Sequence, residues 1–274
     1  MRRIVLIIMI ITALLYVFPI VYTFTNSFMA ESQVKTQYVQ LIPEEFNLQQ
    51  YYTISLYKGE YFKFFATSVK LTVIVIAGQL AIGLLAAFAF AKMKFRGSEL
   101  LFGIYVLAVL LPFQVTLVPN YLLFDKVDGL LGIKLLDTHW AIMLPGIFSS
   151  FGVFLLRQFI RGIPNEVIES ARMDGAGYFK ILFRIILPIV KPAVYALVIL
   201  TFIDNWNLIE QAVIFLDTQA KLPLSVFLEN IYYEDYGVFY AGAVLYVVPA
   251  LIIMQKGERY LREGLAMGGL SNDK

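Results

Sequence analysis

Four polar side chains near the end of one hydrophobic stretch have the chemistry of a sugar site: Asn205, Trp206, Asn207 and Glu210. Sugars bind through aromatic stacking together with hydrogen bonds to amides and carboxylates, and these residues supply each of those groups. A simpler interpretation stays open. Trp206 can anchor the chain at a membrane interface, while Asn205 and Asn207 cap or kink a helix.

Two further polar residues, Gln114 and Asn120, stand beside Pro112 and Pro119 in another hydrophobic stretch. Each is expected to face a cavity or a neighbouring helix, because a polar side chain at membrane depth needs a polar partner. Together with the four residues above, they make six candidates for a substrate path.

No signature of an enzyme or of a resident metal is present. The sequence contains no G-x-x-x-x-G-K-[ST] loop, no H-E-x-x-H and no G-x-S-x-G. It has no cysteine and one histidine, which excludes thiolate and histidine-rich metal sites. We therefore expect no catalytic residue, no metal and no cofactor in this chain. An ion-coupled carrier remains the alternative, but it predicts several intramembrane charges, and Glu210 is the one carboxylate expected near membrane depth.

The elements that position these residues are expected to be membrane-spanning helices. Hydrophobic residues make up 59% of the 274 residues, charged residues 15%, and the mean hydropathy is +0.74, far from the about 45–50% and about 25% of soluble domains. A span needs roughly 20 helical residues, and the sequence predicts six, at about residues 4–23, 67–91, 100–123, 140–156, 185–202 and 237–254. Gly83 and Ala87 form a small-xxx-small pair that allows close helix packing. The prediction is an all-α membrane protein with a single transmembrane domain over residues 1–274.

The basic residues predict the orientation of the spans. The four segments on one side hold 15 of the 22 lysines and arginines, and the opposite loops hold 6. Both termini are therefore expected in the cytoplasm, since Lys and Arg mark cytoplasmic loops. The first span is expected to be a retained anchor rather than a cleaved signal, because its apolar run is long for a signal peptide. A net charge of +2 gives no reason to expect nucleic acid as a partner.

The cytosolic stretch 163–188 is predicted to form two short helices joined by a turn. Pro164 suits a first helical position, and Asp174-Gly175 is a helix stop at which glycine takes the left-handed conformation. Ala171 and Gly175 are small enough to let a partner approach. A second helix is expected to run from Ala176 toward Pro188 and straight into the fifth span, with one apolar face formed by Phe179, Leu182, Phe183 and Ile186. Such a unit is either a rigid handle for a partner or an interfacial helix with none.

This stretch resembles the EAA signature of bacterial binding-protein-dependent ABC importer permeases. The matching residues are Glu169, Ser170 (where the signature has alanine), Ala171, Asp174, Gly175, Ile185, Leu187 and Pro188. The run from Gln114 to Tyr121 and the segment Phe202 to Asn207 resemble motifs of the carbohydrate-uptake, maltose-type subfamily. Leu208 stands where that group often has aspartate.

The resemblance implies a six-span type I ABC importer transmembrane domain in the bacterial plasma (inner) membrane. It implies that this chain is a permease for a sugar or oligosaccharide and forms half of the path. The implied partners are a second permease subunit, two copies of an ATP-binding subunit that hold the ATP and Mg, and an extracytoplasmic solute-binding protein. The eight residues of the signature are then the ATPase-coupling residues.

Overall fold

The computed structural model describes residues 2–35, 38–56 and 60–269, and every regular element in those residues is helical. Four helices are long and apolar enough to span a membrane: α1 (Arg2–Asn26), α4 (Glu60–Lys92), α15 (Tyr236–Gly269), and the run His139–Arg161 that joins α7 (His139–Ile147) to α8 (Ser150–Arg161). Two bent helix pairs pass the same test, which gives six spans in the described chain if each pair is counted as one.

Both bent pairs fall where a straight span was predicted. In the third predicted span, α5 (Ser98–Val109) and α6 (Phe113–Leu131) meet at 107°, and Pro112 caps the start of α6. In the fifth, the helical run Tyr178–Ile189 meets α12 (Lys191–Trp206) at 78°. Proline lacks the N–H that would continue a helix and its ring collides with the carbonyl four residues earlier, so Pro112 and Pro192 suit these breaks. The single transmembrane domain and the exact span limits stay predictions.

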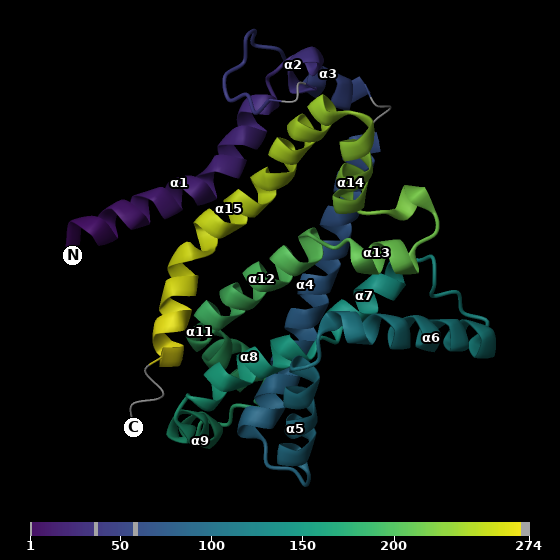
Figure 1. The fold of residues 1–274 in the computed structure, drawn as a ribbon. Helices are drawn as coiled ribbons and strands as arrows, with labels where there is room; N and C mark the ends of the chain where they lie inside the picture. Colours follow the sequence, from purple (N-terminus) through teal and green to yellow (C-terminus); the bar gives the residue numbers. More distant parts are fainter. Residues whose placement is uncertain (1, 36–37, 57–59, 270–274) are drawn as a thin grey trace. The chain divides into compact units, whose positions relative to one another are not determined.

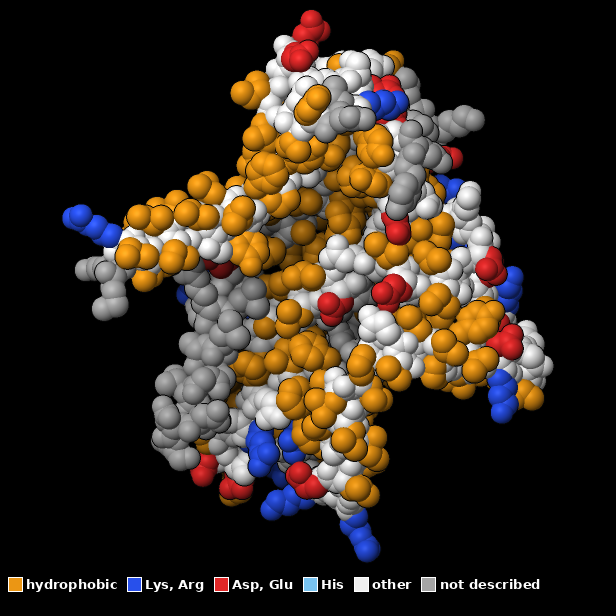
Figure 2. All heavy atoms as spheres, viewed as in Figure 1, with side chains coloured by type: hydrophobic (Ala, Val, Ile, Leu, Met, Phe, Trp, Pro, Cys, Tyr) orange, Lys and Arg blue, Asp and Glu red, His pale blue; other side chains and the backbone are white. Residues whose placement is uncertain are grey.

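Residues 1–67 and 222–251 form one compact unit. It contains α1, α2 (Glu31–Val34), α3 (Gln49–Leu56), α14 (Leu224–Glu234) and the first parts of α4 and α15. Its core joins α3, α4, α14 and α15 through Ile54, Tyr61, Phe64, Leu228 and Ala241. The large hydrophobic side chains of α1 from Ile4 to Ile20 are exposed, which suits a lipid-facing or partner-facing helix (Figure 2).

Residues 68–221 and 252–274 form the second unit (Figure 1). Besides parts of α4 and α15 it holds α5 to α8, α9 (Asn165–Met173), α10 (Tyr178–Ile181), the π-helical turn η1 (Leu182–Ile186), α11 (Leu187–Ile189), α12, α13 (Glu210–Phe215) and the 3₁₀ turn η2 (Gln219–Lys221).

The packing of α4 against α8 explains why small residues stand in both helices. Ala87 is fully buried, and a Cβ on Gly83 would lie 3.7 Å from the backbone of Gly152. A Cβ on Gly152 would lie only 3.0 Å from the side chain of Gln79. The expected small-residue face of the second span is therefore confirmed, and Gly152 is its counterpart on α8.

Candidate functional site

The cytosolic handle begins with α9, an amphipathic helix. Pro164 is its N-cap, one position before the predicted one, and Asn165 is the first helical residue. Ile168 and Ala171 are buried and pack into the same core as Leu84 of α4 and Leu156 of α8. Since the other side of α9 carries exposed polar residues, one face is anchored and the other is free for a partner.

The helix ends in the predicted glycine turn. Gly175 has φ +77°, the left-handed conformation that glycine adopts without steric cost. Its N–H donates to Arg172 O at 2.9 Å, and the Ala176 N–H donates to Ala171 O at 2.9 Å. These two bonds are those of a Schellman motif, which satisfies the last carbonyls of a helix. The predicted helix stop is confirmed.

The signature residues of α9 divide between its two faces. Glu169, Ser170, Asp174 and Gly175 are exposed. A Cβ on Gly175 would meet no atom of the described residues within 4 Å, so these residues leave the turn open. Ala171, by contrast, is 8% exposed and packs inward. Its side chain packs in the chain's own core, and its expected role in the approach of a partner stays a prediction.

The second half of the handle differs from the expected single apolar face. Leu182 and Ile186 are buried, but Phe179 is 70% exposed and Phe183 is 51% exposed, and their two rings stack at 6.5 Å. Phe179 lies in α10, and Phe183 lies in the π-helical turn that follows it. Ile181 and Ile186, five apart, are both fully buried. The chain's own core thus takes Ile181, Leu182 and Ile186, and the Phe179–Phe183 pair of the predicted apolar face is exposed outside it.

The handle does not continue straight into the fifth span. The helical run that contains Ile185, Leu187 and Pro188 stops at Val190, and α12 leaves at 78°. Ile185 and Leu187 are half-buried and Pro188 is exposed. Pro192 has no N–H to donate to the carbonyl of Pro188, so the helix cannot close its hydrogen bonds across this point. The prediction that the second helix of the handle runs straight into the fifth span is wrong, because the chain bends at Val190.

A buried arginine joins three helices beside the handle. The guanidinium of Arg157, on α8, lies 3.6 Å from the ring centre of Phe102 on α5 and donates to Glu99 at 3.3 Å and to Phe90 O of α4 at 3.4 Å. The residue is 3% exposed. In the sequence it was counted only among the cytosolic charges that follow the fourth predicted span, which ended at residue 156.

Two of the six candidate path residues meet in the fold. Gln114 Nε2 of α6 donates to Glu210 Oε2 of α13 at 3.4 Å, and both side chains are exposed. An amide and a carboxylate that are held side by side can bind vicinal hydroxyl groups. Asn120 lies half-buried further along α6. The structure places no solute, so the role of these residues stays a prediction.

The other three candidates, Asn205, Trp206 and Asn207, lie at the C-terminal end of α12. Trp206 is 2% exposed and stacks on Phe202 at 5.1 Å, so it is packed inside the chain. Asn207 caps α12, and its backbone N–H and its Nδ2 both donate to Ile203 O. Asn205 Nδ2 donates to Thr201 O at 2.9 Å. The packing of Trp206 and the capping by Asn207 leave Asn205 and Glu210 as the better placed of the four for a solute.

Two polar features of the membrane segment were missed in the sequence. Thr201 Oγ1 donates to the buried Gln79 of α4, which links α4 to α12. Asp204 lies on α12 and is exposed, so Glu210 is not the one carboxylate near membrane depth. The predicted span ended at Phe202, whereas α12 continues to Trp206. Asp204 stands inside the motif segment Phe202 to Asn207, but that early boundary kept it from being counted as a carboxylate near membrane depth.

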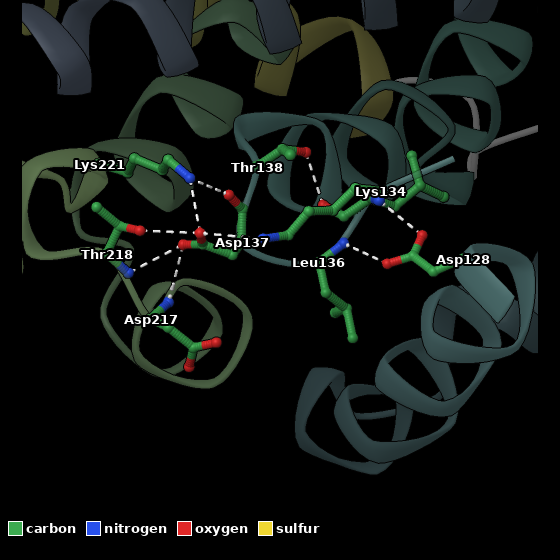
Figure 3. A network of polar contacts seen from close by, with 9 residues as sticks. Asp128, Lys134, Leu136, Asp137, Thr138, Asp217, Thr218 and Lys221 are labelled. Atoms are coloured by element: carbon green, nitrogen blue, oxygen red, sulfur yellow. Dashed lines mark hydrogen bonds and ion pairs between the residues drawn. The ribbon is translucent and has the colours of Figure 1, made fainter. Parts of the chain in front are cut away.

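A second polar network lies in the loops beside α7 and α13 (Figure 3). The carboxylate of Asp137 accepts bonds from the N–H groups of Asp217 and Thr218, from Thr218 Oγ1 at 2.8 Å and from Lys221 Nζ at 2.7 Å. Asp137 is buried and has φ +54°. The Lys221 ammonium, followed by the bonds from Thr218, holds the pKa of Asp137 well below its ordinary value. Asp128 likewise accepts the N–H groups of Leu135 and Leu136.

Among the described residues, no three Asp, Glu or His side chains gather as metal ligands would. The arrangement offers an open helix end beside an anchored helix, and a polar pair on α6 and α13. Both are suited to binding and to transmitting movement.

Comparison with known proteins identifies the family. A sequence profile described as "Binding-protein-dependent transport system inner membrane component" matches residues 79–255. The arabinooligosaccharides transport system permease protein AraQ of Halalkalibacterium halodurans is 27% identical, over 94% of this chain and 92% of AraQ. The polygalacturonan/rhamnogalacturonan transport system permease protein YtcP of Bacillus subtilis is 30% identical, over 80% of this chain and 73% of YtcP.

The fold is also found among solved structures. A chain of a bacterial ABC transporter involved in the import of the acidic polysaccharide alginate superposes with a TM-score of 0.83, at 24% identity, over 95% of this chain and 96% of that chain. The expected ABC importer fold is thereby confirmed. The profile covers more than half of the chain and includes all of α9. The chain therefore belongs to the binding-protein-dependent transport system inner membrane component family, and is a multi-pass permease subunit of an ABC importer in the bacterial plasma membrane.

Proposed function

We propose that this permease couples to an ATP-binding subunit through the open face of α9 and the Gly175 turn. The observation that carries the proposal is the division of α9 into an anchored face and an exposed face that presents Glu169, Ser170 and Asp174. A rigid helix end with open backbone at Gly175 can enter a cleft on a partner without a Cβ in the way. The chain supplies the path and the lever, and ATP and Mg are bound by the partner.

The complete importer in this proposal contains a second permease subunit, so that the two permeases form a heterodimer around one path. Two copies of the ATP-binding subunit dock on the cytosolic side, and an extracytoplasmic solute-binding protein delivers the solute. The exposed apolar side chains of α1 and α6 are consistent with burial against lipid and a second permease. No enzymatic step is assigned to this chain.

The proposed solute is a sugar or oligosaccharide. Two observations support it: the printed names of AraQ and YtcP refer to oligosaccharide or polysaccharide transport, and Gln114 and Glu210 offer an amide and a carboxylate side by side. Asn205 adds a second amide on α12. Asn120, Trp206 and Asn207 complete the proposed path residues, with Trp206 and Asn207 acting through the end of α12.

The test of docking is co-purification of the ATP-binding subunit with tagged permease in mild detergent. Glu169→Gln removes one carboxylate from the exposed face and is expected to weaken association roughly 10-fold, the size of one lost charged hydrogen bond. Glu166→Gln is the matched control, since Glu166 is exposed on the same helix outside the signature, and should associate normally. Equal association of both variants, or no ATPase recovered with the unaltered chain, would contradict the proposal.

A further inference from the structure

Lys92, the last residue of α4, reaches across to the helices on either side of the α8–α9 turn. Its ammonium donates to Ile163 O and, at 2.9 Å, to Asn165 Oδ1, and makes a longer contact of 3.5 Å with Arg161 O. Lysine has three N–H donors and no acceptor, and the three oxygens match them in number. A side chain 73 positions before Asn165 therefore holds the start of α9.

The acceptors are groups that helix ends leave open. Arg161 is the last residue of α8, where the final carbonyls lack partners within the helix and the dipole favours a cation. At the start of α9, Pro164 is the N-cap and provides no side-chain bond. Lys92 satisfies the end of one helix and fixes the first residue of the next, so the turn between them is tied to α4.

The chain's own connection from α9 to α12 is much less direct. It passes through the Gly175 turn, the π-helical turn η1 and the 78° bend at Val190. Each of these points can absorb a rotation before it reaches α12. The apolar core under α9 adds cohesion, but apolar packing is non-directional, whereas three hydrogen bonds to one ammonium fix a geometry.

We propose that Lys92 is a positioning residue that makes α9 and the cytosolic end of α4 move as one body. A push on α9 then moves the second span first and reaches α12 only through the bends. The inference rests on the proposed docking of α9 for its role in transport. The contacts of the Lys92 ammonium with residues 161, 163 and 165, here called the Lys92 clamp, are a property of this chain alone.

The absence of cysteine from the sequence permits a direct distance measurement. Spin labels are attached to Leu85→Cys, on the exposed side of α4, and to Met173→Cys, 88% exposed at the end of α9. The distance distribution is recorded in lipid nanodiscs, with the permease alone and in the assembled importer with and without ATP. One narrow distance is expected in all three samples.

Three variants decide whether Lys92 sets that distance. Lys92→Met keeps the length of the side chain, removes the donors, and is expected to lose the single narrow peak. Lys92→Arg restores charge and donors and is expected to restore the peak. Lys94→Met, at an exposed lysine just past the helix, is expected to change nothing. A narrow peak that survives in Lys92→Met, or is lost equally in Lys94→Met, overturns the proposal.

The measurement separates this inference from the docking proposal. If Lys92→Met broadens the distance in the permease alone while the unaltered chain recovers no ATPase, the clamp stands and docking fails. If docking is normal and the distance in Lys92→Met stays narrow, docking stands and the clamp fails. A change in thermal stability with an unchanged distance assigns Lys92 a purely structural role and also overturns the inference.

Discussion

Two polar regions of the second unit connect its elements through side chains of opposite charge. Beside α9, two cations, Lys92 and Arg157, bind backbone oxygens at helix ends. In the loops beside α7 and α13, one anion, Asp137, binds backbone N–H groups and Lys221. Cations stabilise the C-terminal ends of helices, so the first arrangement joins rigid rods. The second ties loops together, where regular structure leaves N–H groups without partners.

The difference predicts different responses to mutation and to acid. Lys92 and Arg157 join helices, and acid does not remove the charge of a lysine or an arginine. The hydrogen bonds to the Asp137 carboxylate hold two loops together, and acid can break them by protonating that carboxylate.

The largest expected effect is that of Arg157→Met. The change leaves the Phe90 carbonyl without its donor and removes the cation from the Phe102 ring, which together should lower the free energy of unfolding by about 2–3 kcal/mol. Unfolding in mixed SDS micelles measures it. Arg161→Met, an exposed arginine four residues on, is the control and should be near neutral. Equal losses of unfolding free energy in both variants would mean that the buried Arg157 guanidinium contributes no more to stability than an exposed one.

Asp137→Asn should release the loop network without unfolding the helices. Asparagine keeps the shape but loses the ion pair with Lys221, and its NH₂ group turns a donor toward donors. Amide hydrogen exchange should accelerate at residues 217 and 218, while exchange in α9 stays unchanged. Asp125→Asn, at an exposed aspartate of α6, serves as the matched control. Faster amide exchange in α9 would show that the Asp137 network and the cation contacts beside α9 are not independent.

Gly175→Ala should cost about 1 kcal/mol, since a Cβ is disfavoured at φ +77°. Nothing in the chain crowds that position, so the cost is conformational. Gly177→Ala is the control, because Gly177 has φ −73° and also has nothing within 4 Å. Comparable stability of the two variants would argue against the left-handed turn. Gly175→Asn should be milder than alanine, because asparagine tolerates this region better.

Acid should loosen the Asp137 network and leave the Lys92 clamp in place. The pKa of Asp137 is lower in the fold than its ordinary value of 3.8, so the folded state binds fewer protons and stability rises with pH across that interval. The contribution is fully present above pH 3.8 and is lost as the pH falls through the folded-state pKa. Protection of residues 217 and 218, corrected for intrinsic exchange, should therefore hold from neutrality to about pH 5 and decline below 4. A decline centred near neutrality would exclude Asp137 as the titrating group.

Local chemistry decided what the sequence could predict. The helix stop at Asp174-Gly175 was predictable because one residue without a Cβ specifies it. The burial of Ala171 was not, since an alanine fits both a core and an interface. The exposure of Phe179 and Phe183 was not predictable either, since an apolar side chain fits the chain's own core, a lipid surface or a partner. Prolines near both bends were visible, but a membrane helix can also pass a proline without breaking.

Contacts between distant segments were beyond the sequence altogether. The pairs Gln114–Glu210 and Gln79–Thr201 join positions 96 and 122 apart in the chain. Only the packing of α4, α6, α12 and α13 brings them together. Trp206 shows the opposite case, where a residue with the right chemistry for a sugar is used for packing on Phe202. Asp204 was missed because the span was ended four residues early.

Cysteine cross-linking tests the docking of α9 most directly, because the chain has no cysteine of its own. A bifunctional reagent on Ser170→Cys, in membranes that contain the assembled importer, is expected to capture the ATP-binding subunit, with a yield that changes when ATP is added. Asp125→Cys should capture none. Asp125 is exposed on α6 and follows the third predicted span, so with both termini in the cytoplasm it is predicted to lie on the extracytoplasmic side. Absence of the product from Ser170→Cys, or the same yield from Asp125→Cys, would contradict the assignment of α9 as the coupling helix.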